Sequence, residues 1–430
     1  MSAAPIRRAV ILAIGSELLG SSRLDTNSLF ITSALNGIGI EVLFKSVIGD
    51  DRSELAAQFA NALQRADLVV LTGGLGPTED DLTREVVAEH LRLPLDEDPA
   101  ITDAIRRRFA LRGWKMPDIN RRQAMVPRAA VVLGNANGTA PGLWIEAGDK
   151  AIALLPGPPR EMKPMMELVV AERLRPRAGG MVLVRRVLKI AGRSESRVEE
   201  LTQPVYSRWR HHETPIETTI LAAPGLIELH LSARGRDAHA LANVLDRAVN
   251  EIGEVLPNDL FSRDGRSLEE VVGYLLRSRG WRIALAESCT GGLATSRLTD
   301  VPGSSDYVDR SVVAYSNASK TEMLGVAESL IAVHGAVSEP VAEAMARGIR
   351  ERAQVDVGVG ITGIAGPAGG SETKPVGTVC IAVVADAVQV RTFRFPGNRE
   401  LVKTFAAFTA LDMVRRTLVA AAPNVDWETR

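Results

Sequence analysis

The chain has 430 residues, of which 46% are hydrophobic and 24% are charged. This composition is typical of a globular protein with two or three domains and excludes a disordered chain. The formal net charge of −1 provides no overall field to attract nucleic acid or an anionic membrane, so we expect neither as a partner.

The cysteines and the apolar runs indicate the compartment. Cys289 and Cys380 are too few for a disulfide framework or a zinc site, which indicates a reducing cytoplasm. The apolar run at residues 9–15 is soon interrupted by Glu17, so we predict a strand there and not a signal peptide. The longest uncharged stretch, residues 357–371, is rich in glycine and too short to span a bilayer. We therefore expect a cytoplasmic protein.

Strands and helices alternate through residues 1–172, which we take as the first domain. Strands are predicted at residues 9–14 and 67–72, and helices at residues 26–35, at residues 52–63 and in the segment ending at His90. Such alternation predicts a mostly parallel sheet with helices on both faces. Ligands of these sheets bind beyond the carboxyl ends of the strands.

Two acidic turns are predicted at that edge, at residues 49–51 and 73–81. Neither has the spacing of a Walker loop or of a GxGxxG fingerprint. In a structural interpretation, Thr78 and Asp81 form a capping box at the start of a helix. In a functional interpretation, the glycines of the second turn let the backbone approach a phosphate or a pterin, while Asp80 or Asp81 binds Mg²⁺ or activates water.

The pattern changes after the first domain, and residues 173–257 are predicted to form a small α+β module. Its strands are predicted at residues 182–190, 218–221 and 226–233, and its helices at residues 195–201 and 238–255. It contains no recognisable chemistry and no GxxG loop, so we interpret it as a spacer or dimerisation unit, with RNA binding as the weaker alternative. Residues 258–266 are polar and rich in turn residues, which predicts a linker.

The third domain, residues 267–425, again alternates strands and helices. A strand at residues 281–286 leads into AESCTGG at residues 286–292, and a helix is predicted at residues 292–298. A sharp turn between a strand and a helix presents a side chain at the strand end and aims free N–H groups at a ligand. The alternative is a polar loop in which a Ser or Thr caps the helix.

Four further motifs place polar residues and glycines at the ends of apolar strands in this domain. They are VVAYSNASK (residues 312–320), HGAVSEP (residues 334–340), GITGIAGPAGGSETKPVG (residues 360–377) and FPGNR (residues 395–399). Packing alone gives no reason for such clustering, so we expect an active site here.

Ser288 is the candidate nucleophile of this site, and a serine needs a base to accept its proton. We assign that role to Lys320, with Tyr315 as a relay or orienting group. A lysine base must be neutral, so burial must lower its pKa from about 10.4. Cys289 is the rival nucleophile, and it would need His334, the only histidine of the domain.

Backbone groups and one arginine complete the expected site. N–H groups near Gly291 and Gly363 are expected to stabilise an oxyanion, and Arg399 is expected to bind a phosphate.

The motifs AESCTGG, YSNASK, HGAVSEP, GIAGPAGGSETKPVGTV and TGGLGPTEDDLT together resemble the CinA family, the competence/damage-inducible protein A group, over nearly the whole chain. The resemblance implies an N-terminal domain like the molybdopterin-binding MoaB and MogA proteins, a KH-like middle module and a C-terminal nicotinamide-nucleotide amidase domain. We therefore expect an α/β protein with two three-layer domains.

The resemblance also implies an activity, the deamidation of nicotinamide mononucleotide to nicotinate mononucleotide and ammonia without a cofactor. Ser288 would be the nucleophile, activated by Lys320 and Tyr315. The implied substrate-binding residues are Thr290, Gly291, Gly292, Asn317, Thr362, Gly363 and Arg399. We expect a homodimer.

In similar proteins the N-terminal domain can be a metal-dependent ADP-ribose pyrophosphatase. The implied nucleotide or pterin site comprises Glu17, Asn27, Gly73, Gly74, Gly76 and Thr78. Asp51, Asp80 and Asp81 would bind a divalent metal such as Mg²⁺, and K⁺ is a further expected ion. This activity as the main function is one alternative, and a non-enzymatic, competence-related protein that binds nucleic acid or a pterin is another.

Overall fold

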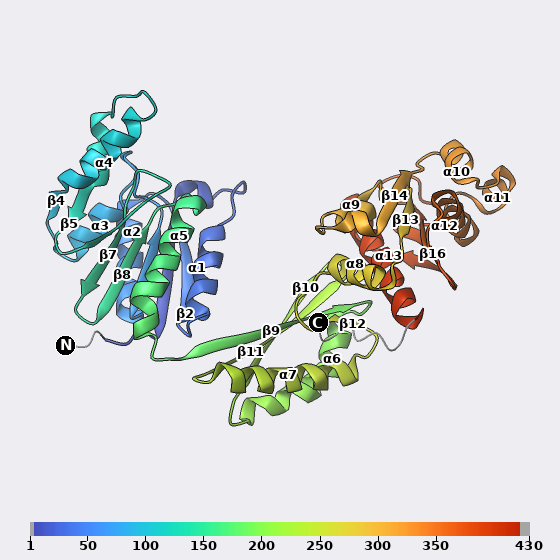
Figure 1. Cartoon of the computed structure of the whole chain (residues 1–430), viewed down its shortest axis with the longest axis horizontal. Helices are drawn as coiled ribbons and strands as arrows, with labels where there is room; N and C mark the ends of the chain where they lie inside the picture. The colour runs from blue at the N-terminus through green and yellow to red at the C-terminus, as the bar shows by residue number, and fades with distance from the viewer. Residues whose placement is uncertain (1–3, 422–430) are drawn as a thin grey trace. The chain divides into compact units, whose positions relative to one another are not determined.

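The computed structural model describes residues 4–421 and divides the chain into two compact units (Figure 1). The first comprises residues up to 184 together with residues 233–242, and the second comprises residues 185–232 and those from 243 onward. Residues 173–257 are thus shared between the units, and the expected end of the third domain at residue 425 lies outside the described residues. No helix among residues 4–421 is both long and apolar enough to cross a membrane.

The first domain contains eight strands and five α-helices. The strands are β1 (Arg8–Ile14), β2 (Glu41–Ile48), β3 (Leu68–Thr72), β4 (Leu95–Glu97), β5 (Met125–Pro127), β6 (Val131–Leu133), β7 (Gly142–Ala147) and β8 (Lys150–Leu155). The helices are α1 (Thr26–Asn36), α2 (Arg52–Arg65), α3 (Thr83–His90), α4 (Pro99–Ala110) and α5 (Pro159–Val169).

The main sheet of this domain has the strand order β2-β1-β3-β8-β7-β6. Its first three pairings are parallel, and the pairings of β7 with β8 and of β6 with β7 are antiparallel. Successive residues of β1 point to opposite faces: Ile11 packs in the core formed with α1 and α5, and Leu12 in the core formed with α2 and α3. The predicted three-layer arrangement is confirmed for this domain.

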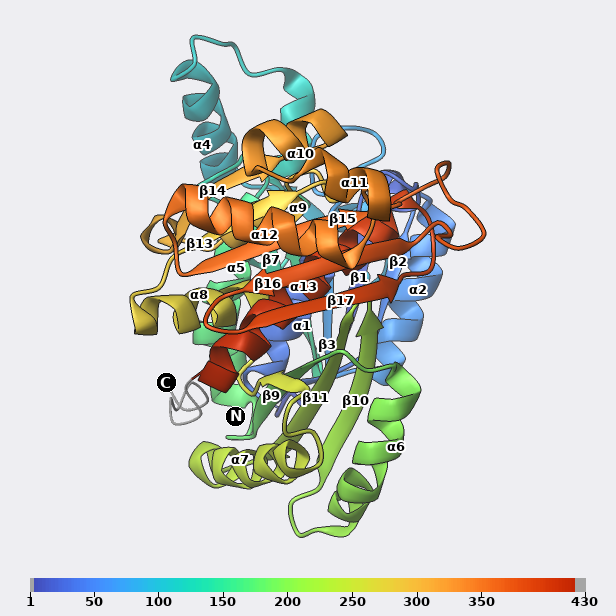
Figure 2. The same ribbon diagram turned by 90° about the vertical axis from the view of Figure 1, so that its right-hand side faces the viewer.

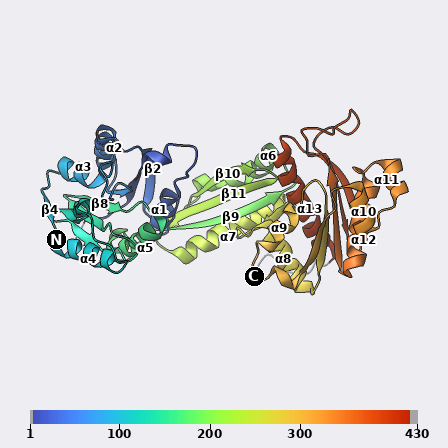
Figure 3. The same cartoon turned by 90° about the horizontal axis from the view of Figure 1, so that it is seen from above.

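The middle strands are β9 (Val182–Ala191), β10 (Ile216–Ala223), β11 (Leu226–Gly235) and β12 (Leu260–Ser262), in the sheet order β10-β11-β9-β12. The helices are α6 (Glu195–Tyr206) and α7 (Ala238–Val255), and α7 runs along one face of the sheet (Figure 3). The predicted linker at residues 258–266 is corrected here, because β12 lies within it, is buried and pairs antiparallel with β9. Burial of Leu260 and Phe261 outweighs the polar composition around them.

The third domain has five strands and six helices. The strands are β13 (Ile283–Glu287), β14 (Val308–Val313), β15 (Val357–Gly363), β16 (Thr378–Val384) and β17 (Val388–Arg394). The helices are α8 (Leu268–Arg279), α9 (Leu293–Thr299), α10 (Asn317–Leu324), α11 (Glu328–His334), α12 (Glu339–Ala353) and α13 (Arg399–Ala421).

Its sheet has the order β14-β13-β15-β16-β17. Crossover helices connect only the parallel strands β13, β14 and β15. The pairings of β15 with β16 and of β16 with β17 are antiparallel, so this sheet is mixed and not mostly parallel. The cause is the segment 364–377, which lacks the helix that a parallel crossover needs. The α/β class itself is confirmed.

Helices cover both faces of this sheet, and they pack closely against its central strand β15. Its sequence VGVGITG directs Val357 and Val359 into the core formed with α8 and α13. Gly358 and Gly360 face α12, where an added Cβ would lie 2.2 Å and 2.1 Å from carbonyl oxygens of that helix. The alternation therefore lets α12 lie directly on the central strand (Figure 2).

Candidate active site

The nucleophile loop begins where β13 ends. The Ser288 amide donates to the Ile361 carbonyl on β15 over 2.9 Å, so the first loop residue still continues the sheet. Ser288 is 7% exposed and lines a cleft of about 260 Å³. Sheet pairing thus fixes the backbone of the candidate nucleophile while its side chain borders the cleft.

Lys320 lies one turn into α10 and is 2% exposed. Its Nζ donates to Ser288 Oγ over 3.1 Å, and to the carbonyl oxygens of Ala314 and Tyr315 over 3.0 and 3.3 Å. Burial lowers the pKa of Lys320 below its usual 10.5, whereas the neighbouring Cys289 acts in the opposite direction. The amine is therefore both aimed at the serine and biased toward the neutral form that a base requires.

Tyr315 is 58% exposed, and its phenol oxygen accepts a hydrogen bond from Arg399 Nη2 over 2.7 Å. Arg399 also donates to the Gly366 carbonyl over 2.9 Å. The phenol contacts neither Lys320 nor Ser288 in the described part of the chain, so the expected proton relay through it is not formed. Tyr315 instead orients Lys320 through its carbonyl oxygen.

Four of the expected substrate-binding residues line the cleft, namely Asn317, Thr362, Gly363 and Arg399. The buried Thr362 donates its hydroxyl to the Ala336 carbonyl over 2.8 Å, which holds the HGAVSEP loop against β15.

The other three, Thr290, Gly291 and Gly292, do not line the cleft. The Thr290 hydroxyl is buried and has no hydrogen-bond partner among residues 4–421.

Glu287, the last residue of β13, determines what the loop amides do. It is fully buried, and its carboxylate accepts hydrogen bonds from the amides of Gly292, Ala294 and Thr295 at 2.9, 3.2 and 2.9 Å. The Gly291 amide donates to the Ser288 carbonyl over 3.1 Å.

The expectation of free N–H groups at the start of α9 is therefore corrected, and Gly291 has no free amide for an oxyanion. Within the described residues, the amides of Cys289 and Thr290 donate to no other residue.

Cys289 is a poor thiolate in this environment. Burial, helped by the charge of Glu287, raises the pKa of its thiol to about 12. His334 does not line the cleft, and its carbonyl oxygen accepts a hydrogen bond from Lys374 Nζ over 2.8 Å. The serine is thus favoured over the cysteine as the nucleophile.

The permanent charge of the cleft is positive, because its lining includes the guanidinium of Arg399 and no carboxylate, while burial biases Lys320 toward the neutral form. The chain as a whole carries a net charge of −1, so this local positive charge is not a property of the composition. Such a cleft suits an anionic ligand.

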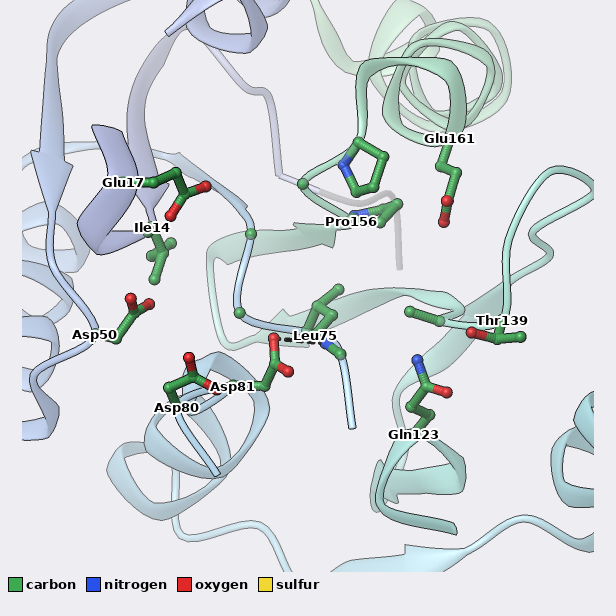
Figure 4. A pocket seen from close by; sticks show the side chains of 17 residues that line it. Ile14, Glu17, Asp50, Leu75, Asp80, Asp81, Gln123, Thr139, Pro156 and Glu161 are labelled. Carbon is green, nitrogen blue, oxygen red and sulfur yellow. Dashed lines mark hydrogen bonds between the residues drawn. The ribbon is translucent and has the colours of Figure 1, made fainter. Parts of the chain in front are cut away.

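The first domain has a pocket of about 320 Å³ at the carboxyl edge of its sheet (Figure 4). Glu17, Gly73, Gly74, Gly76, Asp80 and Asp81 line it, as expected for a site there. Asn27 lines an adjoining pocket that shares Glu17 and Gly157 with the first. Thr78 lines neither pocket.

Asp81 braces the loop that borders this pocket. Its carboxylate accepts the amides of Gly76 and Thr78 over 2.8 and 2.9 Å and also the Thr78 hydroxyl. Helix α3 begins only at Thr83 and lacks a side-chain cap, so the capping-box interpretation is wrong.

Two of the expected metal ligands, Asp80 and Asp81, line this pocket, whereas Asp51 does not. The Asp51 carboxylate caps α2 by accepting the Glu54 amide over 2.9 Å and the Ser53 hydroxyl over 2.6 Å, and Asp50 lines the pocket in its place. Asp50, Asp80 and Asp81 gather on one side of the pocket (Figure 4). Yet among residues 4–421 no three His, Cys, Asp or Glu side chains lie close enough together to hold a metal ion.

Comparison with known proteins places these two sites in one family. Residues 265–418 match the family model described as the CinA C-terminal domain, and residues 10–176 match that of a probable molybdopterin binding domain. A CinA-like protein of Koribacter versatilis is 45% identical over 416 residues, which cover 96% of this chain and 100% of the relative. The chain belongs to the CinA family.

Further members of the CinA family are similar to this chain over comparable or shorter spans. A putative competence-damage inducible protein of Symbiobacterium thermophilum is 43% identical over 427 residues, 96% of this chain and 99% of that one. The crystal structure of the competence/damage inducible protein CihA from Agrobacterium tumefaciens is 39% identical, covers 34% of this chain and 91% of that chain, and has a TM-score of 0.34.

Sequence reasoning missed three acidic residues of this CinA-family chain: Glu287 beside the nucleophile, and Asp50 and Glu161 in the first-domain pocket. Only Glu287 carried a usable signal, because a carboxylate at the end of a fully apolar strand needs several hydrogen-bond donors nearby.

Proposed function

We propose that this CinA-family chain is an amidase that deamidates nicotinamide mononucleotide to nicotinate mononucleotide and ammonia. The observation that carries the proposal is the 3.1 Å hydrogen bond from the buried amine of Lys320 to Ser288 Oγ. The family resemblance supplies the substrate, and the guanidinium of Arg399 in the cleft supports an anionic one.

In the first step, neutral Lys320 accepts the Ser288 proton while Oγ attacks the carboxamide carbon. The carbonyl oxygen becomes an oxyanion, and the amide of Cys289, which lines the cleft, is an uncommitted donor of the loop that can bind it. The C–N bond then breaks, and Lys320 gives its proton to the departing ammonia. An ester joins the acyl group to Ser288.

In the second step, water attacks the ester carbon and Lys320 accepts the water's proton. The bond to Oγ breaks, Lys320 returns the proton to Ser288, and the product leaves as the carboxylic acid, which ionises by giving its remaining proton to water. Each proton transfer to and from Ser288 is handled by one amine, so the proposed reaction requires no cofactor. A neutral Lys320 also does not repel the positive pyridinium ring of the substrate.

Arg399 is the proposed partner of the substrate phosphate. Its guanidinium lines the cleft, and within residues 4–421 it donates only to uncharged oxygens, those of Gly366 and Tyr315. Arginine without a carboxylate partner suits bidentate binding of a phosphate. A cytoplasmic homodimer without a nucleic-acid partner is part of the same proposal.

The test measures ammonia release from nicotinamide mononucleotide by the full chain, Ser288→Ala and Cys289→Ala. We expect Ser288→Ala to reduce turnover by at least about 10³-fold, because the covalent route is lost. Cys289→Ala serves as the matched control and should stay within about threefold of wild type, since its buried thiol is protonated. Turnover retained in Ser288→Ala would exclude the mechanism.

We propose a second role for the first domain, the binding of a nucleotide or a pterin. The observation that favours it is the pocket of about 320 Å³ at the carboxyl edge of the sheet, which Gly73, Gly74 and Gly76 line. A bare backbone here lets a flat ring or a phosphate approach the sheet edge.

Binding and hydrolysis of ADP-ribose by wild type, Asp80→Ala and Asp81→Ala test this role. Each is measured without metal, with Mg²⁺ and with K⁺, because the described residues supply no resident metal site. We expect Asp81→Ala to weaken binding most, since it releases the loop at Gly76 and Thr78. Equal binding by all three proteins would remove the acidic loop from the site.

A further inference from the structure

The buried carboxylate of Glu287 spans the nucleophile loop. On one side it ends β13, immediately before Ser288. On the other side, Oε2 accepts the amides of Gly292 and Ala294, and Oε1 accepts the amide and the hydroxyl of Thr295 at 2.9 and 2.7 Å. One side chain therefore ties the end of the strand to the start of α9 (Leu293–Thr299).

We propose that Glu287 is a positioning residue that holds Ser288 Oγ in line with Lys320. The proposal rests on the proposed amidase function, because it assigns Glu287 a part in that reaction.

The loop geometry supports the proposal. The amide of Ser288 is fixed to Ile361 on β15, and the far end of the loop is fixed to Glu287, so both ends of the turn at residues 288–292 are tied to adjacent strands. The remaining internal bond, from the Gly291 amide to the Ser288 carbonyl, closes the turn. Without the carboxylate, the serine would be located by this bond, by the sheet contact and by the hydrogen bond from Lys320, while the far end of the loop would be free of the strand.

The negative charge of the Glu287 carboxylate matters as well as the shape of its side chain. Both oxygens of Glu287 act only as acceptors, and together they receive four hydrogen bonds from donors that are otherwise left unpaired in the interior. A glutamine of the same shape has one acceptor oxygen, and its NH₂ group would face N–H donors. The carboxylate also occupies the positive end of α9, which leaves the amide of Cys289 as an open donor beside the cleft.

Glu287→Gln therefore tests positioning with little change in volume. Because a misplacement of roughly 1 Å reduces a rate by about 10²-fold, we expect kcat for ammonia release to fall about 100-fold with KM nearly unchanged. Thr295→Val removes only the hydroxyl donor and should give a smaller fall in kcat, again without a change in KM. Glu270→Gln is the matched control, since Glu270 caps α8 by accepting the Ser267 amide over 2.6 Å, away from the cleft.

A second measurement separates this proposal from the amidase assignment. A fluorophosphonate reacts with activated serines, and mass spectrometry of the intact chain gives its rate of reaction with Ser288, without any nicotinamide substrate. We expect Glu287→Gln to slow labelling about 100-fold and Glu270→Gln to leave it unchanged, with circular dichroism confirming that each variant is folded. If wild type is labelled but releases no ammonia, the substrate assignment fails and positioning is still judged from the labelling rates.

Equal labelling rates in wild type, Glu287→Gln and Thr295→Val would overturn the proposal, as would a change in KM alone. If Glu287→Gln does not fold, the labelling rate of Thr295→Val tests the proposal in its place. A labelling rate equal to that of wild type would then overturn the proposal. Absence of labelling in wild type would overturn both the activated serine and its positioning.

Discussion

At Lys320, burial and hydrogen bonding act on the same amine in different ways. Burial disfavours the ammonium, while three oxygens hold the nitrogen in place whether or not it is charged. Cys289, whose charge would raise the pKa of Lys320, is itself kept protonated by burial. The residue is therefore suited to cycle between base and acid.

The pH dependence follows from this shift. Since the pKa of Lys320 is lowered from 10.5, kcat/KM for ammonia release should rise with pH and level off before ordinary lysines titrate. In Lys320→Arg the side chain stays protonated, so kcat/KM should be at least about 100-fold lower than in wild type at every pH. A rise in kcat/KM centred at pH 10.5 or above would contradict the assignment of Lys320 as the base.

The same shift predicts the sign of a stability effect. The folded chain releases the Lys320 proton at a lower pH than the unfolded chain, so the unfolded state binds more protons between the two pKa values. The contribution of Lys320 to the free energy of unfolding should therefore rise with pH across that window.

At the scale of elements, the base is positioned by helix packing. Helix α10 carries Lys320 and ends at Leu324, whose carbonyl oxygen would lie 1.8 Å from a Cβ added at Gly348 on α12. Gly348→Ala should therefore push α10 away from α12, lower the free energy of unfolding by about 1–3 kcal/mol and reduce kcat. Chemical denaturation and the ammonia assay measure the two effects.

The control for this prediction is Arg347→Ala on the same helix. Arg347 is exposed and pairs only with Glu343, four residues earlier, so its loss should change stability by at most about 0.5 kcal/mol. A Gly348→Ala protein as stable and as active as this control would show that α10 is not held by that contact.

The elements also show what sequence can predict. Periodicity located β13 (Ile283–Glu287), α7 (Ala238–Val255) and the alternation of the two α/β domains to within a few residues, because apolar spacing is a local property. Strand ends likewise brought Ser288 and Lys320 to one cleft, since β13 and β14 are parallel neighbours.

Other features depend on partners that local sequence does not name. The sequence did not predict β12 because it lies in a polar segment, where Leu260 and Ser262 pair with a strand about 70 positions earlier. The sequence did not predict hydrogen-bond partners either. The phenol of Tyr315 accepts a hydrogen bond from Arg399, and the Asp51 carboxylate accepts one from the Glu54 amide at the start of α2. Residue types predicted the site, whereas tertiary contacts set the role of each side chain.

At the scale of the whole molecule, a buried ionic network joins α13 to the middle sheet within the second unit. The Asp412 carboxylate binds Arg415 and Arg416 over 2.8 and 2.7 Å, and Arg416 continues to Asp259 over 3.0 Å. Asp259 also binds Arg193 over 2.6 Å. The network links the helix that carries Arg399 to residues beside β9 and β12.

Removing Asp412 should destabilise this unit without altering the chemistry. Asp412→Asn leaves the buried Arg415 without its anion and Arg416 with Asp259 alone, so we expect the free energy of unfolding to fall by about 3 kcal/mol. Asp412 lies about 20 Å along α13 from Arg399, so KM for nicotinamide mononucleotide should not change. Asp386→Asn, at an exposed position, is the control, and equal stability of the two variants would exclude a structural role for the network.

The central claim is that Ser288 becomes acylated, and a rapid acid quench tests it most directly. Wild type and Cys289→Ala are mixed with nicotinamide mononucleotide, quenched during the first turnover and analysed by peptide mass spectrometry. We predict an added acyl group on the peptide that contains Ser288 in both proteins and none in Ser288→Ala. An acyl group on Cys289, or turnover by Ser288→Ala, would contradict the account.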